Sequence, residues 1–360
     1  MTEATILDIR ARTVIAPLQR PIRTASGAIE ASPLVLLDVV TDQGVTGSAY
    51  LFAYTPLMLR PLRALIDQVA PLLRGQPVVP WARQQQLEGQ FRLLGLQGLV
   101  GMVLSTLDMA LWDALGKAVG QPVVRLLGGA PQPVRAYDSW GLVDPVRDEA
   151  ALRHSVAQGF QGIKIKLGGG DLDHDLDTLR AVRRIVGEEV TLMVDYNQSL
   201  APVEAVRRLR ALEPFGLAWV EEPVAAEDLQ GHAQVRAASS TPIQTGENWW
   251  FPRDAERALS ARACDRMMPD LMKIGGITGW LSVMGLARAA SMPMSSHLFI
   301  EASAHVLAVT PTCDWLEFMD FGAAVLQTPC QVDAQGCVTA QGPGLGIVWD
   351  EAAVVRYMVD

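Results

Sequence analysis

Three acidic residues in the second half of the sequence are evenly spaced, and their spacing indicates a metal site. Asp195, Glu221 and Glu247 lie 26 residues apart, and each ends a short apolar run. Three carboxylates that meet at one point cannot all stay ionised unless a cation neutralises them. A ligand set made of oxygens favours Mg²⁺, with Mn²⁺ as an alternative. Glu222 is predicted to point to the opposite face of its strand, which leaves it outside this set.

Two lysines lie one residue apart in the stretch "GIKIKLGGG". In a strand, Lys164 and Lys166 point to the same face, and burying two like charges together is costly. We therefore expect an anion opposite them. Repulsion from Lys164 is expected to lower the pKa of Lys166, so that Lys166 is neutral and basic near working pH.

A carboxylate and an imidazole form a second candidate base. Asp270 and His297 end the sixth and seventh apolar runs counted from residue 134. A carboxylate at one ring nitrogen orients a histidine and raises the basicity of the other nitrogen. We expect His297 and Lys166 on opposite sides of one site. Two bases that flank one carbon can remove a proton from one face and return it on the other.

The elements that must position these residues follow a regular pattern from residue 134 onward. Short apolar runs alternate with amphipathic, helix-like stretches, which is typical of a parallel (β/α) barrel. The expected strands are 134–140, 163–168, 191–197, 217–223, 242–248, 266–273, 292–298 and 315–319. An open doubly wound sheet is the alternative.

Polar residues at the carboxyl ends of these strands favour the barrel. They are Ser139, Lys166, Asp195, Asn197, Glu221, Glu247, Asp270, His297 and Glu317. In a barrel these ends converge on one mouth, whereas an open sheet spreads them along a line.

The chain of 360 residues is expected to divide into three parts. Residues 1–125 suggest an antiparallel meander followed by helices, an α+β capping domain. Residues 134–322 form the predicted barrel, and residues 323–360 are expected to pack back on the capping domain.

Composition limits the classes of partner. A net charge of −9 argues against nonspecific binding to nucleic acid or to anionic lipid. The longest apolar stretch contains Gln97, Asp108 and Asp113, so we expect a buried helix and no membrane span. Four scattered cysteines without a CxxC pair, and an N-terminus without an apolar signal segment, predict a cytoplasmic protein.

These residues and the motifs around them resemble the mandelate racemase group of the enolase superfamily. The motifs are "KIK", "AYDS", "LFAYTP", "VDYNQSL", "GENW", "MKIGGITGW" and "PMSSHLF", and the similarity runs essentially end to end. The use of a Lys or His base with Mg²⁺ is a known property of that superfamily. The resemblance implies a modified (β/α)7β TIM-type barrel with an N-terminal capping domain, a homo-oligomer, and a small carboxylate substrate.

The resemblance also implies a role for each matching residue. Asp195, Glu221 and Glu247 bind Mg²⁺, and Asn197 lies close to the substrate oxygens. Lys166 is the base for one enantiomer, and His297 with Asp270 for the other. Lys164 contacts the substrate carboxylate, Glu317 donates to it as a protonated acid, and Ser139 adds a hydrogen bond.

A substrate-covering segment, "RPIRTASGAIEAS", is implied as well. The apolar lining is expected from Ile22, Ile29, Tyr54, Leu298 and Met319, which suits an aryl group better than a polyhydroxylated chain. The sequence also departs from the family pattern, which has smaller valines at Ile22 and Ile29, histidines at Arg23 and Trp140, and a threonine at Ile165.

Three functions are compatible with this pattern. The first is a Mg²⁺-dependent racemase of mandelate or a similar 2-hydroxy acid, which acts by α-proton abstraction through a metal-stabilised enediolate. The second is an acid-sugar dehydratase, in which the same intermediate expels a β-hydroxyl. The third is a noncatalytic scaffold stabilised by Mg²⁺, which would have no need for two opposed bases.

Overall fold

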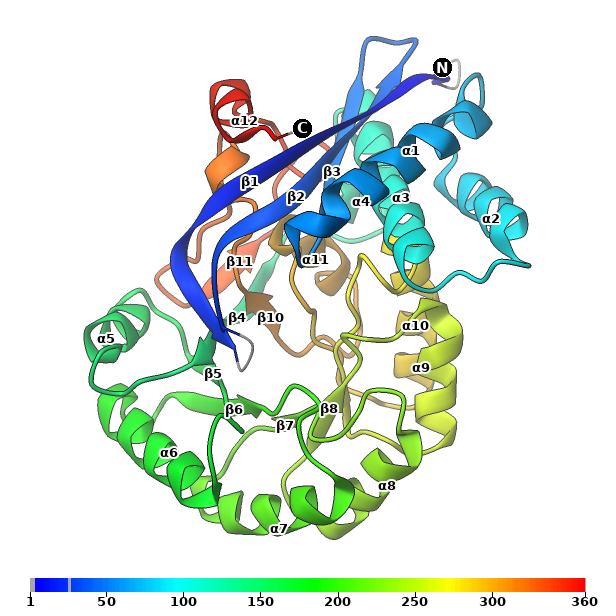
Figure 1. Ribbon diagram of the computed structural model, residues 1–360. Coiled ribbons are helices and arrows are strands. Elements are labelled where there is room, and N and C mark those ends of the chain that lie inside the picture. The colour runs from blue at the N-terminus through cyan, green and yellow to red at the C-terminus, as the bar shows by residue number, and fades with distance from the viewer. Residues whose placement is uncertain (1–3, 25–26, 360) are drawn as a thin grey trace.

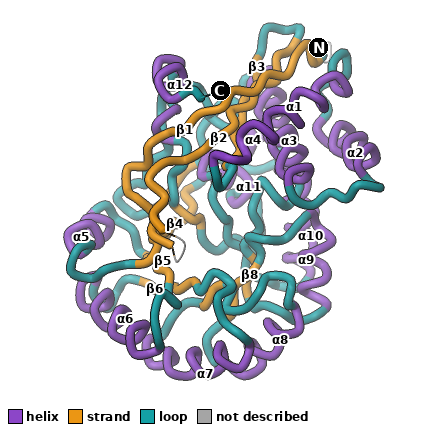
Figure 2. Tube along the Cα trace, in the orientation of Figure 1, coloured by secondary structure: helices purple, strands orange, loops and turns teal. Residues whose placement is uncertain are grey.

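An antiparallel sheet and a parallel barrel make up the protein (Figure 1). The computed structural model describes residues 4–24 and 27–359. The predicted fold class, a (β/α) barrel with an α+β capping domain, is confirmed, and the open doubly wound sheet is excluded because the strands close into a ring (Figure 2). We propose the domain limits 1–125, 134–322 and 323–360. The antiparallel sheet lies in the first part and the parallel barrel strands lie in the second.

The capping region begins with a three-stranded antiparallel sheet, followed by four helices. The strands are β1 (Ile6–Thr24), β2 (Gly27–Thr41) and β3 (Thr46–Phe52), paired in the order β1-β2-β3. A short 3₁₀ turn, η1 (Pro56–Met58), precedes α1 (Leu59–Leu73), α2 (Pro80–Phe91), α3 (Leu99–Ala118) and α4 (Val123–Leu126). The β1–β2 hairpin reaches from this region down to the barrel (Figure 1).

Helix α3 forms the centre of the capping region. It is apolar on nearly every face, as expected of a helix that is covered all round. Its length and composition would allow a membrane span, but 83% of its most apolar window is buried inside the protein. Its polar residues bond to neighbouring elements: Asp108 accepts hydrogen bonds from Thr278, and Asp113 accepts one from the Ser48 amide.

The barrel strands are short and parallel. They are β4 (Pro133–Leu142), β5 (Gly162–Lys166), β6 (Thr191–Asp195), β7 (Val220–Glu221), β8 (Ile243–Thr245), β9 (Arg266–Met267) and β10 (Leu316–Phe318), in the order β10-β4-β5-β6-β7-β8-β9. The helices lie outside the ring (Figure 2): α5 (Glu149–Ala157), α6 (Leu172–Val186), α7 (Pro202–Leu212), α8 (Leu229–Ala238), α9 (Phe251–Ser260), α10 (Gly276–Ala289) and α11 (Ile300–Leu307). A 3₁₀ turn, η2 (Glu213–Phe215), follows α7.

The seventh predicted strand, 292–298, differs from the others. It forms isolated bridges, from Met294 to Met267 and to Cys313 and from His297 to Asp270, and no continuous ladder. Single backbone hydrogen bonds close the ring here, because Ser295 donates to Met267 and Ser296 to Trp315. The prediction was therefore right about the position of this segment and wrong about its regularity.

An aromatic layer fills the barrel below its mouth. Tyr137, Met193, Trp219 and Trp315 form a buried cluster, with Tyr137 edge-on to both tryptophans. Because side chains alternate along a strand, the residues two positions further along β4 and β6, Ser139 and Asp195, also point inward but at the mouth. The layer gives the polar site a dry floor.

The C-terminal segment contacts both parts of the protein. After the 3₁₀ turn η3 (Ala323–Val325), strand β11 (Cys337–Thr339) pairs antiparallel with β4. Helix α12 (Glu351–Tyr357) lies against the capping sheet, where Val359 donates its amide to the Thr13 carbonyl. The indole of Trp349 donates to Asp38 of β2.

Gly47 tests how closely the capping sheet packs on α3. A β-carbon at Gly47 would lie 2.2 Å from the Ala110 carbonyl oxygen and 2.5 Å from the Ala114 β-carbon. We expect Gly47→Ala to lower the free energy of unfolding by about 1–3 kcal/mol, as overpacking does. Urea denaturation followed by circular dichroism measures the effect.

Gly89→Ala is the matched control for Gly47→Ala. Gly89 is exposed within α2, and a β-carbon there would meet no atom within 4 Å. We expect this variant to be more stable than the parent by about 0.5–1 kcal/mol, from helix propensity. Equal stability of the two variants would contradict the close packing of β3 on α3.

Candidate active site

Strand register aligns the first site residues in a row. In the parallel ladder Lys166 is level with Asp195, and Asp195 is level with Glu221. Each of the three is the last residue of its strand. The row therefore lies at the carboxyl ends of the strands, where barrel enzymes carry their chemistry.

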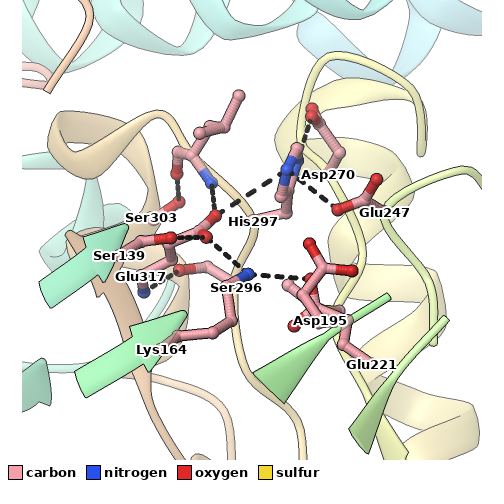
Figure 3. A network of polar contacts seen from close by, with 12 residues as sticks. Ser139, Lys164, Asp195, Glu221, Glu247, Asp270, Ser296, His297, Ser303 and Glu317 are labelled. Atoms are coloured by element: carbon pink, nitrogen blue, oxygen red, sulfur yellow. Dashed lines mark hydrogen bonds and ion pairs between the residues drawn. The ribbon is translucent and has the colours of Figure 1, made fainter. Parts of the chain in front are cut away.

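The three evenly spaced acids meet at one point. Each of Asp195, Glu221 and Glu247 offers one carboxylate oxygen, and these oxygens lie within 4.8 Å of one another. Asp195 and Glu221 are fully buried, and Glu247 is 8% exposed. Figure 3 shows Asp195 and Glu221 side by side, with Glu247 next to His297. We call these three residues the acidic trio.

The two lysines of the stretch "GIKIKLGGG" contact the acidic trio. The Lys164 ammonium lies 2.7 Å from a Glu221 oxygen, and the Lys166 ammonium lies 2.6 Å from an Asp195 oxygen. Lys166 also donates to the Asn197 side-chain oxygen at 2.6 Å. The predicted anion opposite the lysines is therefore supplied, in this structure, by the protein's own carboxylates.

His297 lies at the other end of the trio. Its Nδ1 is 2.7 Å from an Asp270 oxygen, and its Nε2 is 3.2 Å from a Glu247 oxygen. Asp270 is fixed in turn by the Met272 amide, which donates to it at 2.6 Å. Lys166 thus contacts Asp195 and His297 contacts Glu247, so the two nitrogen groups reach the trio through different acids.

A third group gathers around Glu317 (Figure 3). One carboxylate oxygen accepts a hydrogen bond from Ser139 at 2.8 Å and lies 2.7 Å from the Lys164 ammonium. The other accepts from the Leu298 amide at 3.0 Å and is 3.8 Å from His297 Nε2. Lys164 is only 2% exposed and is held between Glu317 and Glu221. On this side of the site, Lys164 and Ser139 are donors already paired with the protein's own carboxylates.

The charges divide the acids into two kinds. Burial raises the pKa of Glu221 to about 8, and the charges of Asp195 and Glu247 add to this despite Lys164. Burial would also raise the pKa of Glu247, but His297 and Lys166 bring it down to about 2. The pKa of one acid is thus raised and that of its neighbour is lowered. A cluster of buried carboxylates of this kind is stabilised by added positive charge.

The pKa of the predicted base Lys166 moves against the prediction. Burial and repulsion from Lys164 lower it as expected, but Asp195 and Glu247 outweigh them and raise it above its ordinary value. For His297, burial lowers the pKa, while Glu247, Glu317 and Asp270 raise it to about 9. Both bases are therefore protonated at neutral pH as long as the acids beside them are uncompensated.

Glu317 also differs from the prediction that it is a protonated acid. Burial would raise its pKa, but Lys164 and His297 lower it to about 2. The prediction overlooked that Lys164, assigned to the substrate, also pairs with Glu317 at 2.7 Å. In this structure Glu317 is a carboxylate that accepts hydrogen bonds.

Two polar residues of the site were missed from the sequence. Asn248 donates to Glu247 at 3.1 Å and to Glu222 at 2.8 Å, so it joins the excluded acid to the trio. The ammonium of Lys273, 6% exposed as a residue, lies 2.7 Å from the Asn248 oxygen. Two signals in the sequence could have indicated them. Asn248 directly follows the predicted ligand Glu247, and Lys273 lies three residues after Asp270 in the same apolar run.

The predicted apolar lining falls in two places. Ile22 and Met319 line a cavity of about 150 Å³ together with Ser139, and Ile29 is paired with Ile22 across the hairpin. Leu298 is buried beside Glu317 through its amide. Tyr54 lies beside Lys273, with its ring centroid 5.2 Å from the Lys273 ammonium.

The residues present fit a divalent cation of the hard, oxygen-seeking class. Buried carboxylate oxygens from three strand ends converge, and burial of Glu221 next to two more acids leaves negative charge to be compensated. The arrangement as a whole combines a metal-type acidic trio, buried donors in Lys164 and Ser139, and two candidate bases. Such a set suits proton transfer at a carbon next to a carboxylate.

Comparison with known proteins places both parts of the chain in one family. Residues 6–128 match the family described as mandelate racemase / muconate lactonizing enzyme, N-terminal domain. Residues 147–353 match the family described as enolase C-terminal domain-like.

Several related proteins resemble the whole chain. A crystal structure of an enolase from Bradyrhizobium, complexed with magnesium and mandelic acid, is 54% identical, covers 100% of both chains and has a TM-score of 0.98. The 3,6-anhydro-alpha-L-galactonate cycloisomerase of Streptomyces coelicolor is 32% identical over 363 residues, which is 97% of this chain and 99% of that enzyme.

Another relative has a different activity. The L-talarate/galactarate dehydratase of Salmonella typhimurium is 36% identical over 231 residues, or 63% of this chain. That match spans 58% of the dehydratase, less than two thirds of its length. The two domain matches and the similarity along the full length agree with the geometry of the site, and the chain belongs to the enolase superfamily.

Proposed function

We propose that the protein is a magnesium-dependent racemase of mandelate or a similar aryl 2-hydroxy acid. One observation carries the proposal: Lys166 contacts Asp195 of the acidic trio, whereas His297, paired with Asp270, contacts Glu247. A racemase needs two bases, because it must take the α-proton from one face of the carbon and deliver a proton to the other, and we infer that Lys166 and His297 take these two places. A scaffold stabilised by a metal ion has no use for two bases.

Asp195, Glu221 and Glu247 would hold the ion, which supplies positive charge beside the substrate carboxylate. Compensation of the trio's negative charge also weakens the interactions that raise two pKa values: those of Asp195 and Glu247 with Lys166, and that of Glu247 with His297. We therefore expect both bases to lose their excess basicity in the loaded enzyme, as a base that works near neutral pH requires.

The substrate carboxylate is expected beside Lys164, Ser139 and Glu317. Removal of the α-proton places a second negative charge on its oxygens, so donors aimed at them act mainly on the transition state. Lys164 is such a donor, held in place by Glu317 at 2.7 Å. Glu317 is a carboxylate in this structure, and we infer that the charge of the bound substrate favours its uptake of a proton.

The hairpin supports an aryl substrate. Ile22 is 7% exposed and lines the cavity that contains Ser139, whereas the neighbouring Arg23 is exposed. Alternation along the strand thus turns the isoleucine toward the cavity next to Ser139 and the Arg23 guanidinium outward, and we infer that Ile22 covers the site from there. The Bradyrhizobium relative that was crystallised with mandelic acid supports the same choice.

An acid-sugar dehydratase is the second candidate. The similarity to L-talarate/galactarate dehydratase favours it, and so does a structure of a mutant L-talarate/galactarate dehydratase with magnesium and L-glucarate, which is 27% identical with a TM-score of 0.92. A dehydratase could use the same bases and then expel a β-hydroxyl. A cytoplasmic location and a homo-oligomeric state stay predictions from the sequence.

The first prediction for this function concerns turnover. In D₂O with Mg²⁺, each pure mandelate enantiomer is expected to take up deuterium at the α-carbon and to lose optical purity. Proton NMR and chiral chromatography measure the two events. Conversion of L-talarate or galactarate to a 2-keto-3-deoxy acid, with mandelate unchanged, would instead establish the dehydratase.

The second prediction separates the two bases. His297→Asn is expected to retain deuterium exchange with one mandelate enantiomer, and Lys166→Met with the other, because each base serves one face. Racemisation should fall by about 10²–10⁴ in both variants. His174→Asn, at an exposed site in α6, is the control and should behave as the parent does. Equal loss of exchange with both enantiomers in both variants would refute the division of roles.

The third prediction concerns the metal. Mg²⁺ at about 100 times its dissociation constant should stabilise the folded protein by about 2.7 kcal/mol, because it binds only the folded trio. Glu247→Gln should abolish most of this stabilisation in thermal unfolding. Glu188→Gln, whose parent side chain is 86% exposed, is the control. Stabilisation by Mg²⁺ that is the same in Glu247→Gln and the parent would place the ion elsewhere.

A further inference from the structure

The end of the β1–β2 hairpin is joined to the rest of its own sheet by an interrupted ladder. Pro17 pairs with Ala31 and Ile22 with Ile29, so β1 advances five residues where β2 advances two. Beyond this irregularity the ladder resumes with three pairs, Ile22–Ile29, Arg23–Ala28 and Thr24–Gly27. We call residues 18–24 and 27–30 the hairpin end. Its position over the barrel must be fixed by other contacts (Figure 1).

Arg20 makes such a contact from within the irregular stretch. Its two terminal nitrogens donate to the two oxygens of Asp138 in β4, at 3.0 Å and 2.7 Å. One of them also donates to the Ser139 carbonyl at 3.0 Å. A forked pair of this kind fixes orientation as well as distance, which a single lysine contact cannot do.

The barrel side of this contact is rigid. Asp138 is 5% exposed and also accepts from the Trp140 indole at 2.7 Å and from Ser155 at 2.5 Å. The Arg20 guanidinium lies over the Trp140 ring, 3.6 Å from its centroid. A partly buried guanidinium that is both paired and stacked is held more firmly than an exposed ion pair.

A second contact lies three residues further along β1. A β-carbon at Gly141 would lie 2.2 Å from the Arg23 carbonyl oxygen and 2.6 Å from its amide nitrogen. The backbone of the hairpin end therefore rests directly on β4, with no room for a side chain between them. Arg20 and Arg23 touch β4 on either side of Ile22, the residue that faces the cavity next to Ser139.

We propose that Arg20 is a positioning residue that sets substrate preference. It fixes the hairpin end on β4, so that Ile22 closes the apolar side of the site and Ser139 keeps its hydrogen bond to Glu317. The substrate side of this inference rests on the proposed function, whereas the structural side does not. Asp138 and Trp140 act through Arg20, since on β4 they alternate with the inward-pointing Ser139.

The kinetic test compares Arg20→Met with the parent on two substrates, mandelate and the smaller lactate. If the hairpin end is in place only about a tenth of the time without the forked pair, KM for mandelate rises about tenfold. kcat changes less, because the bases and the acidic trio are untouched. The preference for mandelate over lactate should fall as well. An unchanged preference would overturn the proposed role in substrate choice.

The structural test needs no turnover. Hydrogen–deuterium exchange of the backbone in residues 18–24 should become faster in Arg20→Met, while exchange in β5 and β6 stays the same. This result separates the inference from the proposed function, because it holds for a racemase and a dehydratase alike. Parental exchange rates in residues 18–24 of the variant would refute the inference even if mandelate is the substrate.

Arg12→Met is the matched control. Arg12 lies on the same strand but pairs with Asp38 and Glu351, on the side of the sheet that carries the C-terminal helix. In Arg12→Met, hydrogen–deuterium exchange in residues 18–24 and the preference for mandelate should be the same as in the parent. Equal effects of Arg12→Met and Arg20→Met would overturn the positioning role of Arg20. If Arg20→Met folds poorly, Arg20→Lys keeps the charge without the fork and should show the same changes in smaller measure.

Discussion

The whole site depends on the compensation of buried negative charge at the barrel mouth. Asp195, Glu221 and Glu247 are brought together with little solvent around them, and burial of carboxylates without partners is strongly unfavourable. Lys164 and Lys166 compensate part of this negative charge through ion pairs of 2.7 Å with Glu221 and 2.6 Å with Asp195. In the proposed function, a bound cation would compensate the acids instead, and the same lysines would then be free to contact the substrate.

The barrel and the capping region contribute different residues to the site. The barrel supplies the charged groups from successive strand ends, above a dry aromatic floor. The capping region supplies the hairpin that carries Ile22, and Arg20 of the same hairpin pairs with Asp138 of β4. In the proposed function, proton chemistry and substrate choice would thus be carried by different elements, in line with relatives of the same superfamily that have different named activities.

The sequence alone predicted the barrel and the residues at its mouth, because both follow from local patterns. The even spacing of Asp195, Glu221 and Glu247 and their place after apolar runs were enough to bring them together. Contacts between distant elements could not be predicted in this way. The pairing of Arg20 with Asp138 joins residues 118 positions apart and leaves no periodic signal. The direction of the Lys166 pKa shift was predicted wrongly for a related reason. It depends on the charges of Asp195 and Glu247, which come from other strands, and residue spacing does not give their distances from Lys166.

The central claim is that Lys166 and His297 face one carbon from opposite sides of a cation held by the acidic trio. A crystal structure of the protein with Mn²⁺ and mandelate, measured with anomalous scattering, tests it most directly. The account predicts one anomalous peak among the oxygens of Asp195, Glu221 and Glu247, with the Lys166 ammonium on one face of the α-carbon and His297 Nε2 on the other. A peak elsewhere, or both nitrogens on the same face of that carbon, would contradict it.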